Sequence, residues 1–240
     1  MKATLDTTLG AIVAGDFRAA AVFQKHGVDF CCHGSRTLEQ ACREADLDGA
    51  ALLGEIQEAS AAPAAGLPRF NEWDLPTLAS YIVANHHAYV RQALPLMVAH
   101  SRKIAEVHGA RHRELARVAQ LVEDVAEEMT THMLKEEHIL FPYITELARA
   151  AASGQPAPFA PFGTVDNPIH MMEAEHASAG AAMLEIRELT DGYRVPDDGC
   201  ATYAVCLQEL EAFERDLHAH VHLENNILFP KASAVEAQRA

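Results

Sequence analysis

Residues 132–142 read HMLKEEHILFP, and residues 220–230 read HVHLENNILFP. Each stretch begins with a histidine, has a glutamate four positions later and ends in ILFP, and the two lie 88 positions apart. Residues four apart project from the same face of an α-helix, so each stretch can present an imidazole and a carboxylate side by side. The repeat therefore predicts two helices that carry the same pair of polar groups.

Both pairs interrupt the apolar stripe of the predicted helix that carries them. His132 and Glu136 lie three and seven positions after Met129, and the second pair follows Leu217 at the same two spacings. An uncompensated buried carboxylate is destabilising, and two carboxylates that face one interior also repel each other. A cation between them removes both costs, so the pattern predicts a metal site inside a helical bundle.

Two further helices should complete the coordination of this metal, because two His–Glu pairs do not fill octahedral sites. His87 lies on the stripe of Val90 and Leu94, and His176 is aligned with Met172 on another predicted helix. Four imidazoles and two carboxylates suit iron, ahead of manganese or zinc. The predicted metal ligands are His87, His132, Glu136, His176, His220 and Glu224.

Buried histidines without a metal are the less specific alternative. A single histidine on an apolar stripe is more often a hydrogen-bonded core residue than a ligand, but the repeat of the whole pattern favours a metal. Ferritin-like centres use Glu-x-x-His, which occurs here once, at Glu173 and His176. The reversed order, His-x-x-x-Glu, occurs twice, and this favours hemerythrin-like ligation.

The remaining sequence is typical of an all-α protein. No useful stretch alternates apolar and polar residues with period two, which argues against a β-sheet. A linker rich in Ala, Pro and Gly at 59–70 separates a small helical domain at 1–58 from a four-helix bundle at 71–240. In the small domain, Thr37 and Gln40 form a helix-capping signature. The four long helical segments are predicted at about 74–107, 111–150, 168–190 and 200–235.

Each ILFP ending should pack the core, and its proline should kink or end the helix behind the metal site. Pro142 and Pro230 are the two prolines concerned. The apolar stripe of the second long segment is expected to continue through Ile139 to Tyr143. His222 lies off the stripe of the last segment and is expected on the surface.

The composition excludes several classes of protein. The formal net charge is −15, which argues against binding to nucleic acid or an anionic membrane, because both need a basic surface. No apolar run is long enough to span a membrane, and we expect no signal peptide. Five cysteines in a chain of 240 residues do not form a secreted disulfide scaffold, so we expect a cytoplasmic protein.

Other polar residues are candidates for supporting roles. Glu128 lies four positions before His132 and Glu175 directly precedes His176, so either carboxylate could orient an imidazole or move protons during catalysis. The alternative for both is a solvated helix face. Cys31 and Cys32 form a vicinal pair that could be redox-active, bind a metal transiently or contact a partner, or simply fill a turn. Three further cysteines on predicted helices are expected to be buried apolar residues: Cys42, Cys200 and Cys206.

These residues together resemble the Repair of Iron Centers family, the iron–sulfur cluster repair di-iron proteins. The resemblance rests on HH-x-x-x-R at 86–91, HMLKEEHILFP, EAEH at 173–176, HVHLENNILFP and the N-terminal DFCCHG at 29–34. It implies a non-haem di-iron centre, oxo- or hydroxo-bridged, held by the six predicted ligands, with Glu136 and Glu224 bridging the irons. It also implies repair of clusters damaged by nitric oxide or oxidants, through iron release, nitric oxide binding or nitric oxide reduction.

Three functional classes remain open on the sequence alone. The first is the di-iron repair protein, with damaged iron–sulfur proteins as partners and nitric oxide or oxygen as small ligands. The second is a hemerythrin-like sensor or carrier of nitric oxide, oxygen or iron that performs no turnover. The third is a metal-free helical protein whose N-terminal domain forms a homodimer.

Overall fold

The computed structural model describes residues 3–61 and 68–239, and the predicted all-α fold is confirmed. Within these ranges the only β-type pairing is an isolated bridge between Thr8 and Thr37. The chain divides into two compact units. The first comprises Met1–Ala79, Leu147–Pro158 and His218–Ala240, and the second comprises Ser80–Glu146 and Phe159–Leu217. None of the helices in the described ranges has the length and apolar character needed to cross a membrane.

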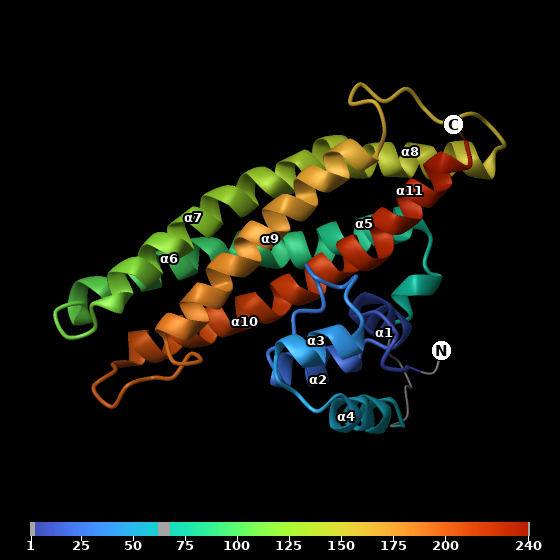
Figure 1. The fold of residues 1–240 in the computed structure, drawn as a ribbon. Helices are drawn as coiled ribbons and strands as arrows, with labels where there is room; N and C mark the ends of the chain where they lie inside the picture. Colours follow the sequence, from blue (N-terminus) through green and yellow to red (C-terminus); the bar gives the residue numbers. More distant parts are fainter. Residues whose placement is uncertain (1–2, 62–67, 240) are drawn as a thin grey trace. The chain divides into compact units, whose positions relative to one another are not determined.

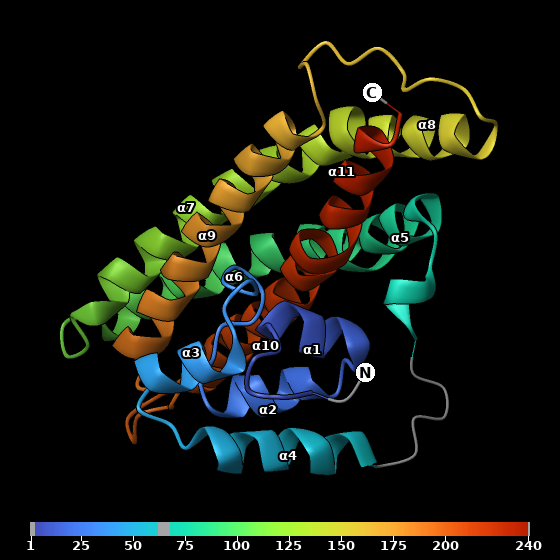
Figure 2. The same cartoon turned by 45° about the vertical axis from the view of Figure 1, so that its right-hand side comes forward.

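The first unit begins with short helices around a small apolar core. The Thr8 hydroxyl caps the first helix, and Thr37 with Gln40 forms the predicted capping box. Phe23 and Phe30 stack at 5.8 Å between ring centroids and are almost fully buried. α4 packs against α2 (Figure 2). The helices are α1 (Leu9–Gly15), α2 (Ala19–Lys25), α3 (Leu38–Glu44) and α4 (Gly49–Ala61).

The predicted linker at 59–70 is only partly described. α4 extends to Ala61, residues 62–67 lie outside the described ranges, and a 3₁₀ turn, η1, covers Phe70–Glu72. α5 (Leu75–Ile82) then begins where the Asp74 carboxylate accepts a hydrogen bond from the Thr77 backbone, at 2.8 Å. The domain boundaries at 58 and 71 stay a prediction.

The first unit also contains the end of the last long helix. There Asn226 reaches the DFCCHG loop: its Nδ2 donates to the carbonyl oxygens of Phe30 at 3.3 Å and Cys31 at 3.2 Å. Lys231 donates to the carbonyl oxygens of Asn71 and Trp73. Within this unit, the Asn226 bonds fix the cysteine loop to the C-terminal helical segment, and the Lys231 bonds fix the turn at 71–73 to the same segment.

The second unit contains the greater part of the four long segments predicted at 71–240, and the end of the last segment belongs to the first unit. α7 packs against α6 and α9, and these helices run side by side in Figures 1 and 2. α10 is joined to α6 by a His100–Glu209 hydrogen bond and to α9 by Arg187, which donates twice to the buried Glu214. The long helices are α6 (Ala88–His108), α7 (Glu114–Lys135), α9 (Asp166–Leu189) and α10 (Ala201–Leu223, of which 201–217 belongs to this unit).

Three π-helical turns interrupt the long helical segments: η2 (Val83–His87), η3 (Glu136–Leu140) and η4 (Glu224–Leu228). In η3 the Phe141 backbone N–H donates to the Glu136 carbonyl, five residues back, and in η4 Phe229 donates to Glu224 in the same way. π-turns of this kind are rare and recur at functional sites. Here each turn begins or ends at a predicted metal ligand.

The π-turns change two details of the sequence interpretation. Helices α8 (Phe141–Ala152) and α11 (Phe229–Ala237) follow η3 and η4, so Pro142 and Pro230 are the second residues of new helices and do not end the chain's helical course. The extra residue in η3 also rotates the stripe. Ile139 is therefore 51% exposed, while Leu140 and Tyr143 are buried.

Candidate metal centre

Four predicted ligands converge within the second unit. His87 ends η2, His132 lies on α7, Glu136 opens η3 and His176 lies on α9. All four side chains are fully buried. Glu136 Oε2 lies 3.2 Å from His87 Nε2 and 3.4 Å from His132 Nε2, and the Nε2 atoms of His132 and His176 lie 3.0 Å apart.

The other two predicted ligands form a pair within the first unit. His220, near the end of α10, and Glu224, the first residue of η4, are also fully buried. His220 Nε2 lies 2.9 Å from Glu224 Oε1. The i,i+4 spacing in HVHLE produces this contact directly, because the two side chains share one helix face.

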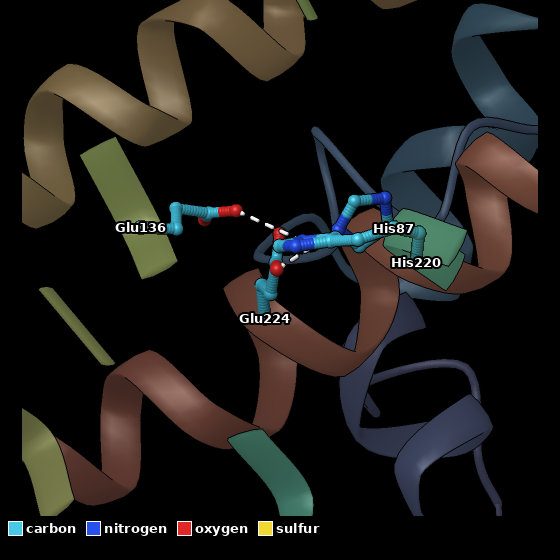
Figure 3. Close-up of side chains that lie close together, drawn as sticks. All are labelled: His87, Glu136, His220 and Glu224. Carbon is cyan, nitrogen blue, oxygen red and sulfur yellow. Dashed lines mark hydrogen bonds and ion pairs between the residues drawn. The ribbon is translucent and has the colours of Figure 1, made fainter. Parts of the chain in front are cut away.

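The ligand atoms fall into two groups, in each of which the atoms lie within 4.8 Å of one another. Glu136 and Glu224 belong to both groups. Figure 3 shows the first group, in which each carboxylate points at an imidazole. The groups are His87, Glu136, His220, Glu224 and His132, Glu136, His176, Glu224.

Two of the imidazoles contact a carboxylate through Nδ1, the ring nitrogen that does not face the other ligands. His87 Nδ1 lies 2.6 Å from Glu137 Oε1, and Arg91 also donates to Glu137. Burial would raise the pKa of the Glu137 carboxyl, but the hydrogen bonds from Arg91 and His87 hold this pKa below its usual value. With the Nδ1 proton directed at a carboxylate, Nε2 of His87 can present a lone pair to a cation.

The second imidazole–carboxylate pair repeats this arrangement on the neighbouring helices. His132 Nδ1 lies 2.9 Å from Glu175 Oε2, and Lys135 donates to the same carboxylate. Burial opposes ionisation of Glu175, but the hydrogen bonds from Lys135 and His132 outweigh it and keep its pKa low. The ionised form of Glu175 can then orient His132 in the same way.

The donor set fits a transition metal. Each group offers two imidazoles and two carboxylates, all without solvent exposure. A dry site with this many ligating atoms at close range is tolerated when positive charge lies among them. Mixed imidazole and carboxylate ligation is the chemistry that iron, manganese and zinc accept.

Comparison with protein families assigns both parts of the chain. Residues 78–232 match the hemerythrin HHE cation binding domain. Residues 5–60 match a domain of unknown function, DUF542. The first match contains all six residues of the two groups, so a cation-binding fold and a buried donor set coincide in this chain.

Full-length relatives have the same extent. The iron–sulfur cluster repair protein YtfE of Yersinia pestis (strain Pestoides F) is 34% identical over 225 residues, which cover 94% of this chain and 96% of the relative. The protein of the same name from Yersinia pseudotuberculosis (serotype O:1b, strain IP 31758) is equally similar. The chain belongs to the Repair of Iron Centers family. The sequence resemblance is thereby confirmed.

Of the two acidic residues expected behind the ligands of this family member, one contacts an imidazole. Glu175 hydrogen-bonds His132, although its neighbour in sequence is His176. Glu128 accepts a hydrogen bond from the Ser178 hydroxyl at 3.1 Å, on the partly solvated face between α7 and α9. The sequence pattern did not identify Glu137 as a partner of His87, and its only signal was its position as the second Glu of KEEH.

His222 was wrongly expected on the surface. It is fully buried within the first unit, where the rings of Phe30 and Phe17 lie 5.8 and 6.2 Å from it. Burial lowers its pKa to about 3, so the ring is neutral, and its Nδ1 lies 3.2 Å from the Asn226 amide. This part of the last helix is buried on two faces, which a single apolar stripe does not reveal.

The cysteine loop of the family's N-terminal domain forms a third polar cluster. The sulfur atoms of Cys31 and Cys32 lie 3.7 Å apart, and Asp29 accepts from both backbone N–H groups. The hydrogen bond with Cys32, followed by burial, raises the pKa of the Cys31 thiol well above its usual value. Cys32 is half-buried, so it is the thiol of this pair that a reagent can reach.

Proposed function

We propose that the six residues His87, His132, Glu136, His176, His220 and Glu224 hold two non-haem iron ions. The proposal rests on one observation: Glu136 and Glu224 each belong to both groups of closely spaced ligand atoms. A carboxylate has two oxygens and can therefore join two cations. An oxo or hydroxo bridge is the exogenous ligand that this arrangement suits.

Iron in this environment would supply redox chemistry and open coordination positions for a small ligand. The residues of the chain contribute the rest. The buried apolar surroundings exclude bulk water, and Glu137 and Glu175 fix the orientation of His87 and His132. Glu175, which is bonded to both His132 and Lys135, is the carboxylate best placed to hold or pass a proton near the site. Glu128, bonded to Ser178, is a weaker candidate for that role.

The function supported best is repair of iron–sulfur clusters damaged by nitric oxide or oxidants. The Yersinia relatives are named as iron–sulfur cluster repair proteins and match nearly the whole chain. Damaged iron–sulfur proteins are then the clients, and nitric oxide or oxygen the small ligands. Repair can proceed by release of iron to the client or by removal of nitric oxide, including its reduction to nitrous oxide.

The other elements of the proposal concern the thiols and the surroundings. We assign Cys31 and Cys32 a redox or partner-contact role, supported by the 3.7 Å contact of their sulfur atoms. A cytoplasmic location suits a chain whose five cysteines are all free thiols. The strongly acidic composition is consistent with no binding to nucleic acid or membranes. A homodimer through the N-terminal domain stays a prediction.

Reactivation of a damaged enzyme tests this function. A dehydratase with a [4Fe–4S] cluster is inactivated by nitric oxide, freed of excess reagent and incubated anaerobically with the iron-loaded protein. We expect activity to return with the wild-type protein and to stay low with Glu136→Gln, because a carboxamide is a poor bridge between cations. Glu127→Gln, on the exposed face of α7, is the matched control and should repair as well as the wild type.

Two further measurements make the outcome specific. An equal amount of ferrous salt must not restore activity by itself, and nitrous oxide is measured in the headspace. Recovery with Glu136→Gln equal to that of the wild type would refute the proposed site. Tight binding of nitric oxide with neither recovery nor nitrous oxide would instead establish the sensor or carrier.

A further inference from the structure

A second cluster of reactive side chains lies in the bundle, far from the metal centre. Cys200 directly precedes α10, and its neighbour His108 is the last residue of α6. His108 lies 21 residues after His87, so a helical rise separates them by roughly 30 Å along α6. Cys200 was expected to be a buried apolar residue, but it is exposed.

His108 is a buried histidine with one ring nitrogen directed at a thiol. Its side chain is only 6% exposed, and its Nε2 lies 3.2 Å from Cys200 Sγ. Its Nδ1 is buried without a hydrogen-bond partner among the described residues. The ring packs edge-on against Tyr203 at 5.3 Å between centroids, which fixes its orientation. A buried imidazole is thus directed at an exposed thiol.

The backbone of α10 also stabilises the thiolate form of Cys200. Hydrogen bonding with His108 is the main cause that lowers the pKa of the Cys200 thiol to about 7, and the backbone N–H groups of Tyr203 and Thr202 add to it. These N–H groups belong to the first turn of a long helix, where the helix dipole favours a negative charge. A large fraction of Cys200 is therefore thiolate near neutral pH.

The surroundings can bind a small charged molecule. Asp198 lies between two basic side chains, at 2.9 Å from His112 Nε2 and 3.1 Å from Arg111. Beside them lies a pocket of about 330 Å³. It is lined by His112 and Tyr203, which are near Cys200, and by Arg194 and acidic side chains. Charges of both signs suit a zwitterionic ligand with carboxylate and ammonium groups.

Cys200 has no cysteine partner along its own helix. Cys206 is fully buried, and six residues of helix separate the two by roughly 9 Å, beyond the reach of a disulfide. A mixed disulfide formed at Cys200 would therefore not be resolved by Cys206. The site favours a stable adduct with a small thiol.

We propose that Cys200 and His108 form a thiol-exchange site that accepts one half of a small zwitterionic disulfide of the glutathione type. The Cys200 sulfur attacks one sulfur of the disulfide, the S–S bond of the disulfide breaks, and a new S–S bond forms to Cys200. The other half leaves as a thiolate. When Cys200 starts protonated, its proton passes to His108 Nε2 and then to this leaving thiolate, so the exchange is balanced.

Oxidised glutathione is the probe for this site. The full-length protein is incubated with it at pH 7, and the adduct is located by intact mass and peptide mapping. We expect one glutathionyl group on Cys200, absent from Cys200→Ser and retained in Cys32→Ser. An adduct on Cys32 alone would overturn the proposal.

The pH profile of the rate tests the role of His108 as a positioning residue. If His108→Asn returns the thiol pKa to roughly 8.5, the thiolate fraction at pH 7 falls about 16-fold, and the higher nucleophilicity of the more basic thiolate recovers about fivefold. We therefore expect a rate about threefold slower at pH 7 and about fivefold faster at pH 10. His170→Asn, at an exposed position of α9 outside this pocket, should keep the wild-type profile. A His108→Asn profile identical to that of the wild type would contradict the pairing.

Discussion

At the scale of single residues, Glu137 and Glu175 orient two histidines of the proposed metal centre. Each takes the Nδ1 side of one imidazole and is held by one cationic side chain, Arg91 or Lys135. The cation keeps the carboxylate ionised, and the carboxylate keeps the Nδ1 proton of the histidine in place. The Nε2 atom is therefore ready for a metal before the metal binds.

Substitution of Glu175 by Gln tests this support. The amide keeps the shape of the side chain but loses the charge that orients His132, so we expect iron affinity to fall about 10- to 100-fold. The measurement is competition for ferrous iron with a chelator of known affinity under anaerobic conditions. Glu127→Gln is the control on the same bundle, and equal affinities for Glu175→Gln and the wild type would contradict the role of this carboxylate.

The sequence singled out the six proposed ligands, all of them buried, because they are polar residues at core-facing positions. A histidine and a glutamate on an apolar stripe stand out, and the stripe of α7 or α10 can be followed from Met129 or Leu217. Glu137 and Cys200 do not stand out in this way in the sequence. Their partners, His87 and His108, lie 50 and 92 positions away, so only the fold reveals the contacts.

At the scale of elements, two π-turns begin at the glutamates of the proposed centre: η3 at Glu136 and η4 at Glu224. A straight α-helix through HMLKEEHILFP would have kept Ile139 in the core, but the extra residue of η3 turns it outward and brings Leu140 inward. The extra residue of a π-turn does not alter the hydrophobic period of the helix before it. Helical periodicity therefore predicted the helices but not the π-turns. A proline follows η3 and η4, at Pro142 and Pro230, and it cannot donate the backbone hydrogen bond that a regular helix would need there.

The fit between α1 and the η4 turn gives a test at this scale. A Cβ on Gly10 would lie 2.1 Å from Asn226 Oδ1, and Asn226 cannot move freely because it is bonded to the cysteine loop. We expect Gly10→Ala to lower the free energy of unfolding by about 1–3 kcal/mol. The midpoint of urea unfolding measures this.

The same helix provides the control. A Cβ on Gly15 would meet nothing within 4 Å, so Gly15→Ala should be neutral or stabilise by about 0.5 kcal/mol. If both variants unfolded at the same urea concentration, the close contact between Gly10 and Asn226 would carry no energetic weight.

At the scale of the whole molecule, the chain combines a cation-binding bundle with a smaller helical region that carries a cysteine loop. The fold class and the four long segments followed from helical periodicity and the Pro- and Gly-rich breaks, and the short helix after Thr37 followed from its capping signature. The capping of local helices is a short-range property and can be predicted from sequence. The burial of His222 depends on packing by Phe17 and Phe30, which lie 205 and 192 positions earlier, so the local sequence pattern does not reveal it.

The most direct measurement is the anaerobic stoichiometry of ferrous iron bound by the purified protein and by its Glu136→Gln and Glu224→Gln variants. Because both glutamates lie in both ligand groups, we expect about two irons per wild-type chain and loss of iron from each variant. Glu127→Gln should bind as the wild type does. A wild-type protein that binds no iron, or variants that retain both ions with unchanged affinity, would contradict the account.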